Sequence, residues 1–354
     1  MRAAESLTTT LRQKSAAQAP GEKLPSVRAI MKRYGASLHS VNIALRQLET
    51  EGLIDVRKGS GIYVSPRKGL RYIELHRLQS PAIWADTKEI SLGRAIAKEG
   101  WRMLVKRHPT EYDDPDIQLN PKACAHIVIP SLFETNPLFF KQITRMAVPV
   151  LVYGRVAGPF QMDYVTGDDY QYLSLLIKHL RSLGHQRLAF LANEPPSLPL
   201  TQRSEIFLNI AELFELPEPV IIDCKTRSGE SSMYKACEGL KNYLMEHDRK
   251  PPFTAIIVSS QQGVLGALRG CHESGVSVPR DCSVVSFGLA SENALMTPSV
   301  TEAGAADESW GEGCVSVLKQ RFEHPDAPPI GLKLPPKLFI RESTAAPART
   351  ANKR

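Results

Sequence analysis

A glycine-rich turn, RKGSG at residues 57–61, is the first stretch of this sequence whose residue types could do chemistry. Two cations beside two glycines are typical of a loop that cradles phosphate. Such a loop needs a strand before it and a helix after it, because amides at the helix N-terminus hold the phosphate. Here the strand formers Ile62 and Val64 follow, and then Pro66. The turn is therefore interpreted as the tip of a β-hairpin and not as a cofactor loop.

Other residues with catalytic side chains have structural explanations. His185 follows the helix-terminating Gly184 and precedes an apolar run, which is typical of a turn residue. Asp168 and Asp169 open a helical segment, where acids cap the helix and favour its dipole. The sequence has no Ser/His/Asp spacing, H-E-x-x-H, C-x-x-C or Walker motif. We expect no catalytic residue, metal site or cofactor, and thus no enzyme.

The compartment follows from apolar runs and cysteines. No apolar run approaches the roughly 20 residues that a membrane span requires, and the start MRAAESLTTTLRQ has no hydrophobic signal core. The six cysteines are scattered without a C-x-x-C pair, so we expect buried free thiols; they are Cys124, Cys224, Cys237, Cys271, Cys282 and Cys314. These features predict a cytoplasmic protein that does not bind membranes.

Charge is unevenly distributed along the 354 residues. Residues 1–69 hold 12 Lys or Arg against 5 Asp or Glu, which accounts for the whole net charge of +7. The rest of the chain holds 32 residues of each sign. A small basic unit on a neutral body indicates a module that binds a polyanion and a separate sensor or catalytic domain.

Helix signals organise this basic unit. LPSVRAIMKRYG offers Ser26 as an N-cap and ends at Gly35, and a second helix runs from Ser37 as N-cap to Gly52. Two helices joined by about four residues form a helix-turn-helix, whose second helix enters the major groove. The polar face at the start of that helix carries His39, Ser40, Asn42 and Arg46. The hairpin of residues 54–64 follows.

The stretch from Gly21 to Val64 resembles the winged helix-turn-helix of GntR-type bacterial transcription regulators. The resemblance rests on LPS-x-R, the AL-x-x-LE-x-EGLI block and the glycine-rich wing, without a gap. It implies that Arg28, the start of the second helix and the wing contact DNA. The candidate DNA contacts are Ser26, Arg28, Ser37, His39, Ser40, Asn42, Arg46, Arg57, Lys58, Gly59, Ser60 and Gly61. Leu38 and Asn42 stand where the family often has arginine or lysine, which implies a different base preference or fewer phosphate contacts.

Beyond residue 71 apolar runs alternate with helical segments. HIVIP, VPVLVYG, RLAFLA, PVIID, TAIIVSS and CSVVSFG are typical of strands, whereas LLIKHLRSLG and GVLGALRGCHESG are helical. This alternation favours a parallel α/β architecture with ligands bound beyond the carboxyl ends of the strands.

The body resembles the effector domain of LacI/GalR-type regulators, which has the two-lobed fold of periplasmic sugar-binding proteins. The blocks that carry the resemblance are VPVLVYGR, YVTGDDYQYLSLLIKHLRSLGHQRLAFL, PPFTAIIVSSQQGVLGALRGCHESGVSVPRDCSVVSFG and LPPKLFIREST. The expected fold class is α/β, a small winged helix-turn-helix domain plus a two-lobed periplasmic-binding-protein-like domain with parallel sheets. Expected units are the head (1–66), a linker (67–71), the body (72–345) and a disordered tail (346–354). Crossovers between lobes are expected near 163–167, 291–298 and 322–328.

The same resemblance implies an effector site between the lobes. Arg203 matches the family's ligand-binding arginine, although Ile206 replaces the glycine usually found three residues later. Many sugar-binding members have aspartates where this chain has Gly154, Gln261 and Gly288. Because aspartates accept hydrogen bonds from sugar hydroxyls, either the effector is a modified sugar or a non-sugar, or the pocket has lost ligand control.

The expected function is a transcriptional regulator, a repressor, that binds a pseudo-palindromic operator as a homodimer and responds to a small effector. Two other classes were weighed. The basic head argues against a free-standing solute-binding protein. An enzymatic body, such as the aminotransferase domain that some GntR-type regulators carry, would need more residues than follow Gly69 and a lysine that binds the cofactor. The sequence shows neither feature.

Overall fold

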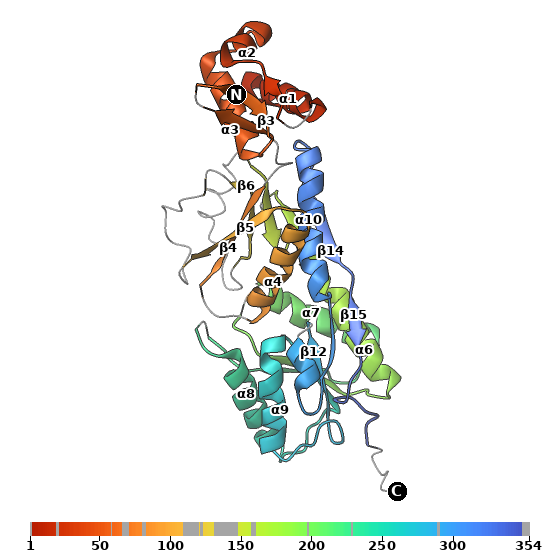
Figure 1. Cartoon of the computed structure of the whole chain (residues 1–354). Helices are drawn as coiled ribbons and strands as arrows, with labels where there is room; N and C mark the ends of the chain where they lie inside the picture. The colour runs from red at the N-terminus through yellow and green to blue at the C-terminus, as the bar shows by residue number, and fades with distance from the viewer. Residues whose placement is uncertain are drawn as a thin grey trace.

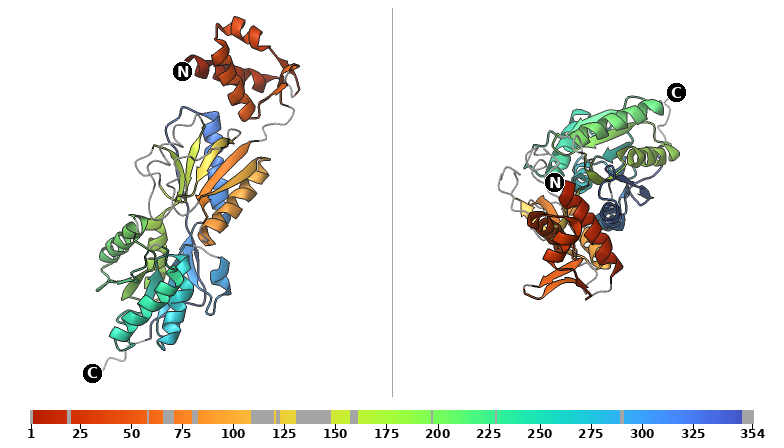
Figure 2. Two further views of the ribbon diagram at one scale, coloured as in Figure 1. Left: turned by 90° about the vertical axis from the view of Figure 1, so that its left-hand side faces the viewer. Right: turned by 90° about the horizontal axis from the view of Figure 1, so that it is seen from above.

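The computed structural model describes residues 2–18, 21–57, 59–65, 71–79, 83–108, 120, 123–130, 148–156, 161–196, 198–227, 229–288 and 291–348. These residues form three sheets: a small one in an N-terminal head and a six-stranded one in each of two α/β lobes. Head, lobe 1 and lobe 2 follow one another along an elongated molecule, with the head at one end (Figure 1; Figure 2).

The head contains three helices and a three-stranded antiparallel sheet. Its elements are α1 (Arg2–Ala17), β1 (Lys23–Leu24), α2 (Val27–Tyr34), α3 (Leu38–Thr50), β2 (Ile54–Arg57) and β3 (Gly61–Val64), with strand order β1-β3-β2. Ile30, Val41 and Leu48 are buried in its core together with Leu7 and Leu11 of α1. Arg12 of α1 forms a two-point ion pair with Glu51, at 2.6 and 2.9 Å, so α1 is tied to the end of α3.

Capping side chains set the two predicted helices of the head. The Ser26 hydroxyl accepts a hydrogen bond from the Ala29 amide, and α2 ends at Gly35, whose φ of 61° is left-handed. The Ser37 hydroxyl accepts from the Ser40 amide at the start of α3. The helix-turn-helix and the hairpin are therefore confirmed, whereas α1 was not predicted.

Lobe 1 is built on an all-parallel sheet with strand order β14-β8-β7-β6-β4-β5. The strands are β4 (Tyr72–Leu78), β5 (Arg102–His108), β6 (Ala123–Val128), β7 (Val150–Tyr153), β8 (Asp163–Gly167) and β14 (Gly331–Leu334). Helices α4 (Ile83–Lys98) and α10 (Asp307–Glu323) pack against each other and the sheet, with Leu92 and Leu318 buried in the shared core.

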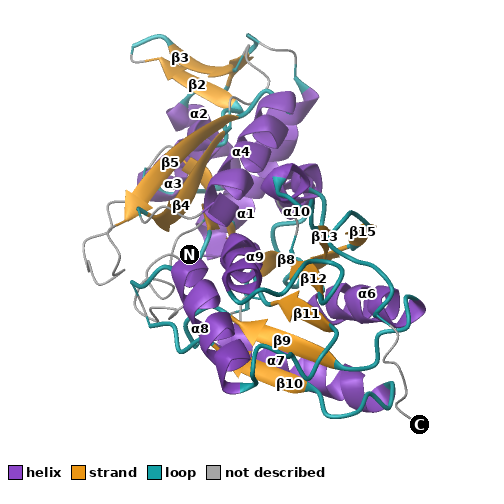
Figure 3. Cartoon of the chain, turned by 90° about the horizontal axis from the view of Figure 1, so that it is seen from below, coloured by secondary structure: helices purple, strands orange, loops and turns teal. Residues whose placement is uncertain are grey.

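Lobe 2 has strand order β10-β9-β11-β12-β13-β15, parallel except for the last pair. The strands are β9 (Leu188–Ala192), β10 (Val220–Asp223), β11 (Ala255–Val258), β12 (Ser283–Phe287), β13 (Thr301–Gly304) and β15 (Lys337–Phe339). Its helices are α6 (Asp169–Ser182), α7 (Leu198–Leu213), α8 (Ser232–Glu246) and α9 (Val264–Glu273), with short 3₁₀ turns η1 (Gln261–Gly263) and η2 (Ser291–Leu295). Helices α6 and α7 pack on one face of the sheet, and α8 and α9 on the other (Figure 3).

The chain passes between the lobes three times. The first passage joins β8 to α6 at residues 167–169, at the end of the expected segment. The other two expectations were wrong: the passages are at residues 305–306, between β13 and α10, and at residues 335–336, between β14 and β15.

Hydrogen bonds and an ion pair show why the second and third expected crossovers were wrong. Residues 291–298 lie inside lobe 2, where Asn293 donates to Glu302 of β13 at 2.6 Å. Residues 322–328 stay in lobe 1, because Arg321 binds the carbonyls of Pro325 and Pro328 and pairs with Asp163 of β8 at 2.7 Å. An alternation of strands and helices shows where elements begin, but not which sheet each strand joins.

The remaining predictions of the body are largely confirmed. The six apolar runs contribute β6, β7 and β9 to β12, and the two helical runs fall in α6 and α9. Residues 66–70, which contain most of the expected linker, and residues 349–354 of the expected tail lie outside the described residues. Among the described helices, none is long and apolar enough to cross a membrane.

Candidate functional site

The predicted DNA-contacting residues of the head divide into caps and outward-facing side chains. Ser26 and Ser37 are engaged as N-caps, and the Ser40 hydroxyl lies 3.0 Å from that of Ser37. The other predicted helix residues are exposed, namely Arg28, His39, Asn42 and Arg46. The serines therefore fix the starts of α2 and α3, and the other four side chains face solvent.

Two glycines in the turn of the wing adopt positive φ angles. Gly59 and Gly61 have φ of 77° and 129°, a region that L-residues rarely adopt. Arg57 stacks over the Tyr63 ring at 4.7 Å, and the Ser60 hydroxyl lies 2.9 Å from the Tyr63 hydroxyl. Lys58 lies outside the described residues. The turn thus presents a cation on a rigid strand pair.

Exposed apolar residues on the recognition helix were not predicted as contacts. Leu38 is 53% exposed and Ile43 is 43% exposed, although both belong to α3. Apolar side chains at the major groove contact the methyl group of thymine. Leu38 stands at the first position of α3, where the departure from the resembled family pattern was noted.

A pocket lies between the lobes, and all four predicted effector residues line it. Gly154 follows β7 of lobe 1, Gln261 and Gly288 follow β11 and β12 of lobe 2, and Arg203 comes from α7. The cavity measures about 150 Å³, enough for a ligand of one six-membered ring. Its position beyond the carboxyl ends of parallel strands is the usual ligand site of such sheets.

Arg203 is fixed in the pocket by three contacts. Its Nε donates to Asp169 at 2.8 Å and its Nη1 to the carbonyl of Ser259 at 3.2 Å. The guanidinium lies 4.1 Å from the centroid of the Phe287 ring. A pre-oriented guanidinium retains donors for an acceptor-bearing ligand at little entropic cost.

Lys88 of α4 adds a second cation that sequence reasoning missed. Its Nζ lies 3.6 Å from the centroid of the Trp310 ring. Burial lowers the pKa of Lys88 to about 8, against the opposing effect of Asp307. Gly154 has φ of 104°, and a Cβ atom there would lie 3.2 Å from Cε of Lys88. The lysine therefore fills space beside a position at which the resemblance implied a carboxylate.

Polar and aromatic groups complete the walls. Glu194 is buried and accepts hydrogen bonds from Ser232 at 2.7 Å and from Ser260. Aromatic rings come from both lobes, namely Tyr153, Trp310, Tyr172 and Phe287. Within the described residues the Tyr172 hydroxyl is buried without a hydrogen-bond partner. Aromatic faces with a few polar groups suit a polar ring.

The residues assigned structural roles behave as expected. Asp168 caps α6 by accepting from the Gln171 amide. His185 is buried and bonds Thr254, Ser283 and the carbonyl of Ala345, so it holds the turn and the C-terminal segment in lobe 2. All six cysteines are free, and five are buried.

One cluster that the sequence did not predict has residues of the types that can hold a metal ion. Glu74, His76 and His126 are buried in lobe 1, and a ligand atom of each lies within 4.8 Å of the others. The signal was present in YIELHRL, because period-two alternation places Glu74 and His76 on one face of β4. The pairing of β4 with β6, some 50 residues away, could not be derived from sequence.

Comparison with known families agrees with this architecture. Residues 2–64 match the family described as bacterial regulatory proteins, gntR family, and residues 177–344 match the periplasmic binding protein-like domain. The chain joins a GntR-type head to a periplasmic-binding-protein-like body. Together the matched ranges contain the exposed start of α3, the wing and most of the lobe 2 side of the pocket.

Individual relatives include named regulators. The chain is 24% identical to the HTH-type transcriptional regulator reg1 of Streptomyces lividans, over 87% of this chain and 88% of that one. It is also 24% identical to the arabinose metabolism transcriptional repressor of Geobacillus stearothermophilus, over 92% of each.

Solved structures share the fold of the body. A LacI transcriptional regulator from a Rhodococcus species has a TM-score of 0.66 at 20% identity, covering 78% of this chain and all of that one. A LacI family regulator from Enterococcus faecium with bound ribose has a TM-score of 0.63 at 18% identity, covering 78% of this chain and 99% of that one.

Proposed function

We propose that this protein is a cytoplasmic, DNA-binding transcriptional repressor controlled by a small effector, and that it is not an enzyme. The observation that carries the proposal is a ligand-sized pocket between two lobes in a chain that also has a GntR-type head. The head (1–66) binds DNA, and the body (72–345) binds the effector. Relatives that are named as repressors support the sign of regulation.

The proposed DNA complex is a homodimer on a pseudo-palindromic operator. Two copies of α3 then enter successive major grooves about one helical turn apart. Arg28, Arg46 and the wing meet phosphates, while His39, Asn42 and Leu38 face base edges. Lysines and arginines displace counterions, so affinity falls steeply as salt rises.

The proposed effector is a ring-sized, sugar-like molecule with an acidic substituent. Lys88 lies beside Gly154, and Arg203 offers a fixed guanidinium. Two cations suit a carboxylate or phosphate on the ligand, whereas the hydroxyl of Tyr172 suits a sugar hydroxyl. Aromatic rings from both lobes enclose the apolar faces of the ring. A sugar-like ring also agrees with a relative named for arabinose metabolism.

Matched ligand pairs test this effector class. The melting temperature of the full chain is measured with glucose, gluconate and glucose 6-phosphate, and with galactose and galacturonate. We expect the acidic member of at least one pair to raise the melting temperature while its neutral partner leaves it unchanged. Equal effects of neutral and acidic members would contradict the role of Lys88, and Lys88→Gln is the matched variant.

DNA binding is tested with a duplex selected by the wild-type protein from a random-sequence library. We expect Arg46→Ala to weaken binding to that duplex at fixed salt, because Arg46 is exposed on α3. Arg280→Ala is the control, since Arg280 is an exposed arginine of lobe 2 that pairs with Asp281. Equal affinity of Arg46→Ala and wild type would refute the proposed contact, and failure to select any duplex would refute DNA binding itself.

A further inference from the structure

A buried polar cluster lies on lobe 1, on the sheet face opposite the core. In β4, Ile73 and Leu75 pack into the hydrophobic core, so Glu74 and His76 point to the other face. Glu74 is the direct register partner of His126 on β6. His76 and His126 are fully buried, and Glu74 is 6% exposed. Ionisable groups buried together like this require a partner or a function.

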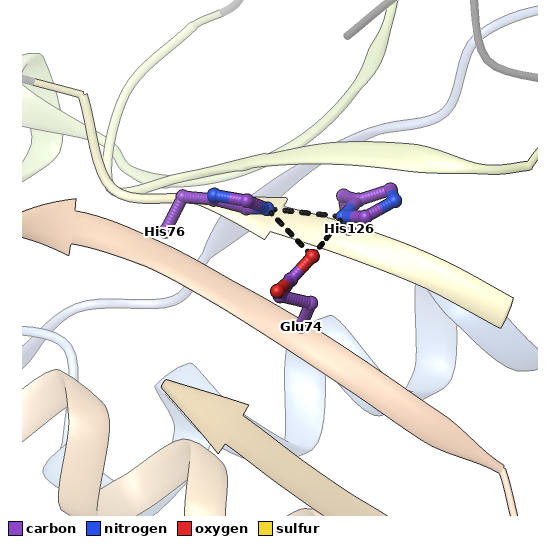
Figure 4. A group of neighbouring side chains, drawn as sticks. All are labelled: Glu74, His76 and His126. Atoms are coloured by element: carbon purple, nitrogen blue, oxygen red, sulfur yellow. Dashed lines mark hydrogen bonds and ion pairs between the residues drawn. The ribbon is translucent and has the colours of Figure 1, made fainter. Parts of the chain in front are cut away.

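Three ligand atoms of the cluster converge on one point (Figure 4). Nε2 of His76 lies 3.0 Å from Nδ1 of His126, and Oε2 of Glu74 lies 3.5 and 3.2 Å from these two nitrogens. In a tetrahedral zinc site with bonds near 2.0–2.1 Å, neighbouring ligand atoms lie about 3.3 Å apart. The triangle therefore has the dimensions of one face of that tetrahedron.

Hydrogen bonds alone satisfy this triangle poorly. The two ring nitrogens and the carboxylate oxygen face one another, and each neutral imidazole has only one N–H. A single proton placed between two of the atoms leaves the third facing them with its lone pair, whereas a proton on each nitrogen sets two N–H groups against each other at an N···N distance of 3.0 Å. Within the described residues, Nε2 of His126 is buried and has no hydrogen-bond partner, so contacts at Nδ1 alone set the orientation of this ring. A cation at the centre satisfies all three atoms at once.

His108 of β5 supports the cluster from behind. Its Nε2 lies 3.0 Å from Nδ1 of His76, and the two rings stack at 5.3 Å. The Asn120 amide donates to Oε2 of Glu74 at 3.1 Å. Metal-ligating histidines commonly use the second ring nitrogen in this way, which fixes the tautomer and the ring orientation. His108 is thus a positioning residue.

We propose that Glu74, His76 and His126 form a binding site for a divalent transition-metal ion, best matched by Zn²⁺. Two imidazole nitrogens exclude a preference for Mg²⁺ or Ca²⁺, which select oxygen ligands. Three protein ligands leave a fourth position for water or another donor. The ion would join β4 to β6 in the lobe whose strands β6 and β7 lead to the effector pocket.

The test uses tag-free, full-length protein that has been treated with chelator and dialysed. Co²⁺ is titrated in, because tetrahedral cobalt absorbs in the visible range, and Zn²⁺ is then added in competition. We expect one tetrahedral Co²⁺ per chain, displaced by one equivalent of Zn²⁺, and a higher melting temperature with Zn²⁺ than with chelator.

Single substitutions distinguish the proposed metal ligands from histidines that do not bind the metal. Glu74→Gln, His76→Gln and His126→Gln are each expected to weaken Co²⁺ binding by about 100-fold or more. His108→Gln should keep the tetrahedral bands and lose about 10- to 100-fold in affinity. His272→Gln, an exposed histidine of α9, should bind as wild type does.

Two results would overturn the proposal. One is a wild-type protein without tetrahedral cobalt bands at one equivalent. The other is a folded Glu74→Gln, His126→Gln double variant, checked by circular dichroism, that retains them. Since the spectrum and stoichiometry of the wild type decide the first outcome, a variant that fails to fold does not block the test.

Discussion

Lys88 and Gly154 lie side by side in the wall of the pocket and determine much of its chemistry. The positive φ of Gly154 disfavours an aspartate there, and the lysine stem occupies the adjacent space. An anionic ligand group can therefore bind a side chain whose ammonium already rests against Trp310. The same burial makes the charge of Lys88 sensitive to pH.

The affinity for an acidic effector should fall as the pH rises through about 8. Burial lowers the pKa of Lys88 to about 8, so the side chain is cationic below this pH and neutral above it. Affinity should be constant below pH 7 and then decrease by up to about tenfold per pH unit above 8. Calorimetric titration of the acidic ligand measures this. Lys88→Gln should bind weakly with no such decrease; a wild-type profile that is flat to pH 9.5 would contradict the assignment.

Leu38 offers a test of base preference at the start of α3. We expect Leu38→Ala to weaken binding to the selected duplex several-fold and to relax preference at one thymine, since the exposed side chain is placed to contact its methyl group. Leu208→Ala, at an exposed leucine of α7, is the matched control. Repeating the library selection with each variant gives the readout. An unchanged preference for Leu38→Ala would show that the leucine does not read a base.

The sequence predicted the residues of the pocket better than those of the proposed metal site. Gly154, Arg203, Gln261 and Gly288 were placed in one pocket because a family resemblance supplied their spatial relation. Lys88 was not, since it lies outside the sequence blocks that carry the resemblance. The histidine cluster joins residues from three strands, and only the register of those strands reveals it.

The helices of the head follow local rules, and their limits are visible in α1. The helices α2 and α3 have capping residues that can be recognised in the sequence, namely Ser26, Gly35 and Ser37. The segment of α1 lacks such signals and carries few large apolar residues. Its helix depends instead on packing Leu7 and Leu11 into the head core and on the Arg12 pair with Glu51. Contacts of this kind join residues that are far apart in the sequence, so local sequence patterns cannot predict them.

Ser37 separates the cost of losing a cap from the cost of losing a DNA contact. Ser37→Ala should remove about 1 kcal/mol of helix stability, which lowers the melting transition of a small head domain by about 4–8 °C. Ser37→Asp keeps the cap and should restore that transition, yet its negative charge should weaken binding to the selected duplex. Thermal circular dichroism and anisotropy report the two effects. If Ser37→Asp bound DNA as wild type does, the start of α3 would not lie near phosphates.

Three passages of the chain join the two lobes of the body. Two of them were misplaced from sequence, because the pairing of distant strands decides which sheet β14 and β15 join. β14 pairs with β8, more than 100 residues earlier in the chain, whereas β15 pairs with β13 of the other lobe. Residues 305–306 pass directly beside the pocket, where Ala305 and Asp307 line its wall. A ligand that binds both lobes can therefore favour one lobe arrangement over another, in proportion to its differential affinity.

The proposed coupling is tested most directly by titrating the selected duplex with the full chain, with and without the acidic ligand that raises the melting temperature most. We predict that the ligand changes the operator affinity of wild type by about 5- to 150-fold. Arg203→Ala should bind the duplex with wild-type affinity and show no ligand response, because Arg203 lines the pocket and belongs to α7 of lobe 2, which lies far from the head (Figure 1). An operator affinity that no pocket ligand changes, or an Arg203→Ala variant that responds fully, would contradict control of DNA binding by this pocket.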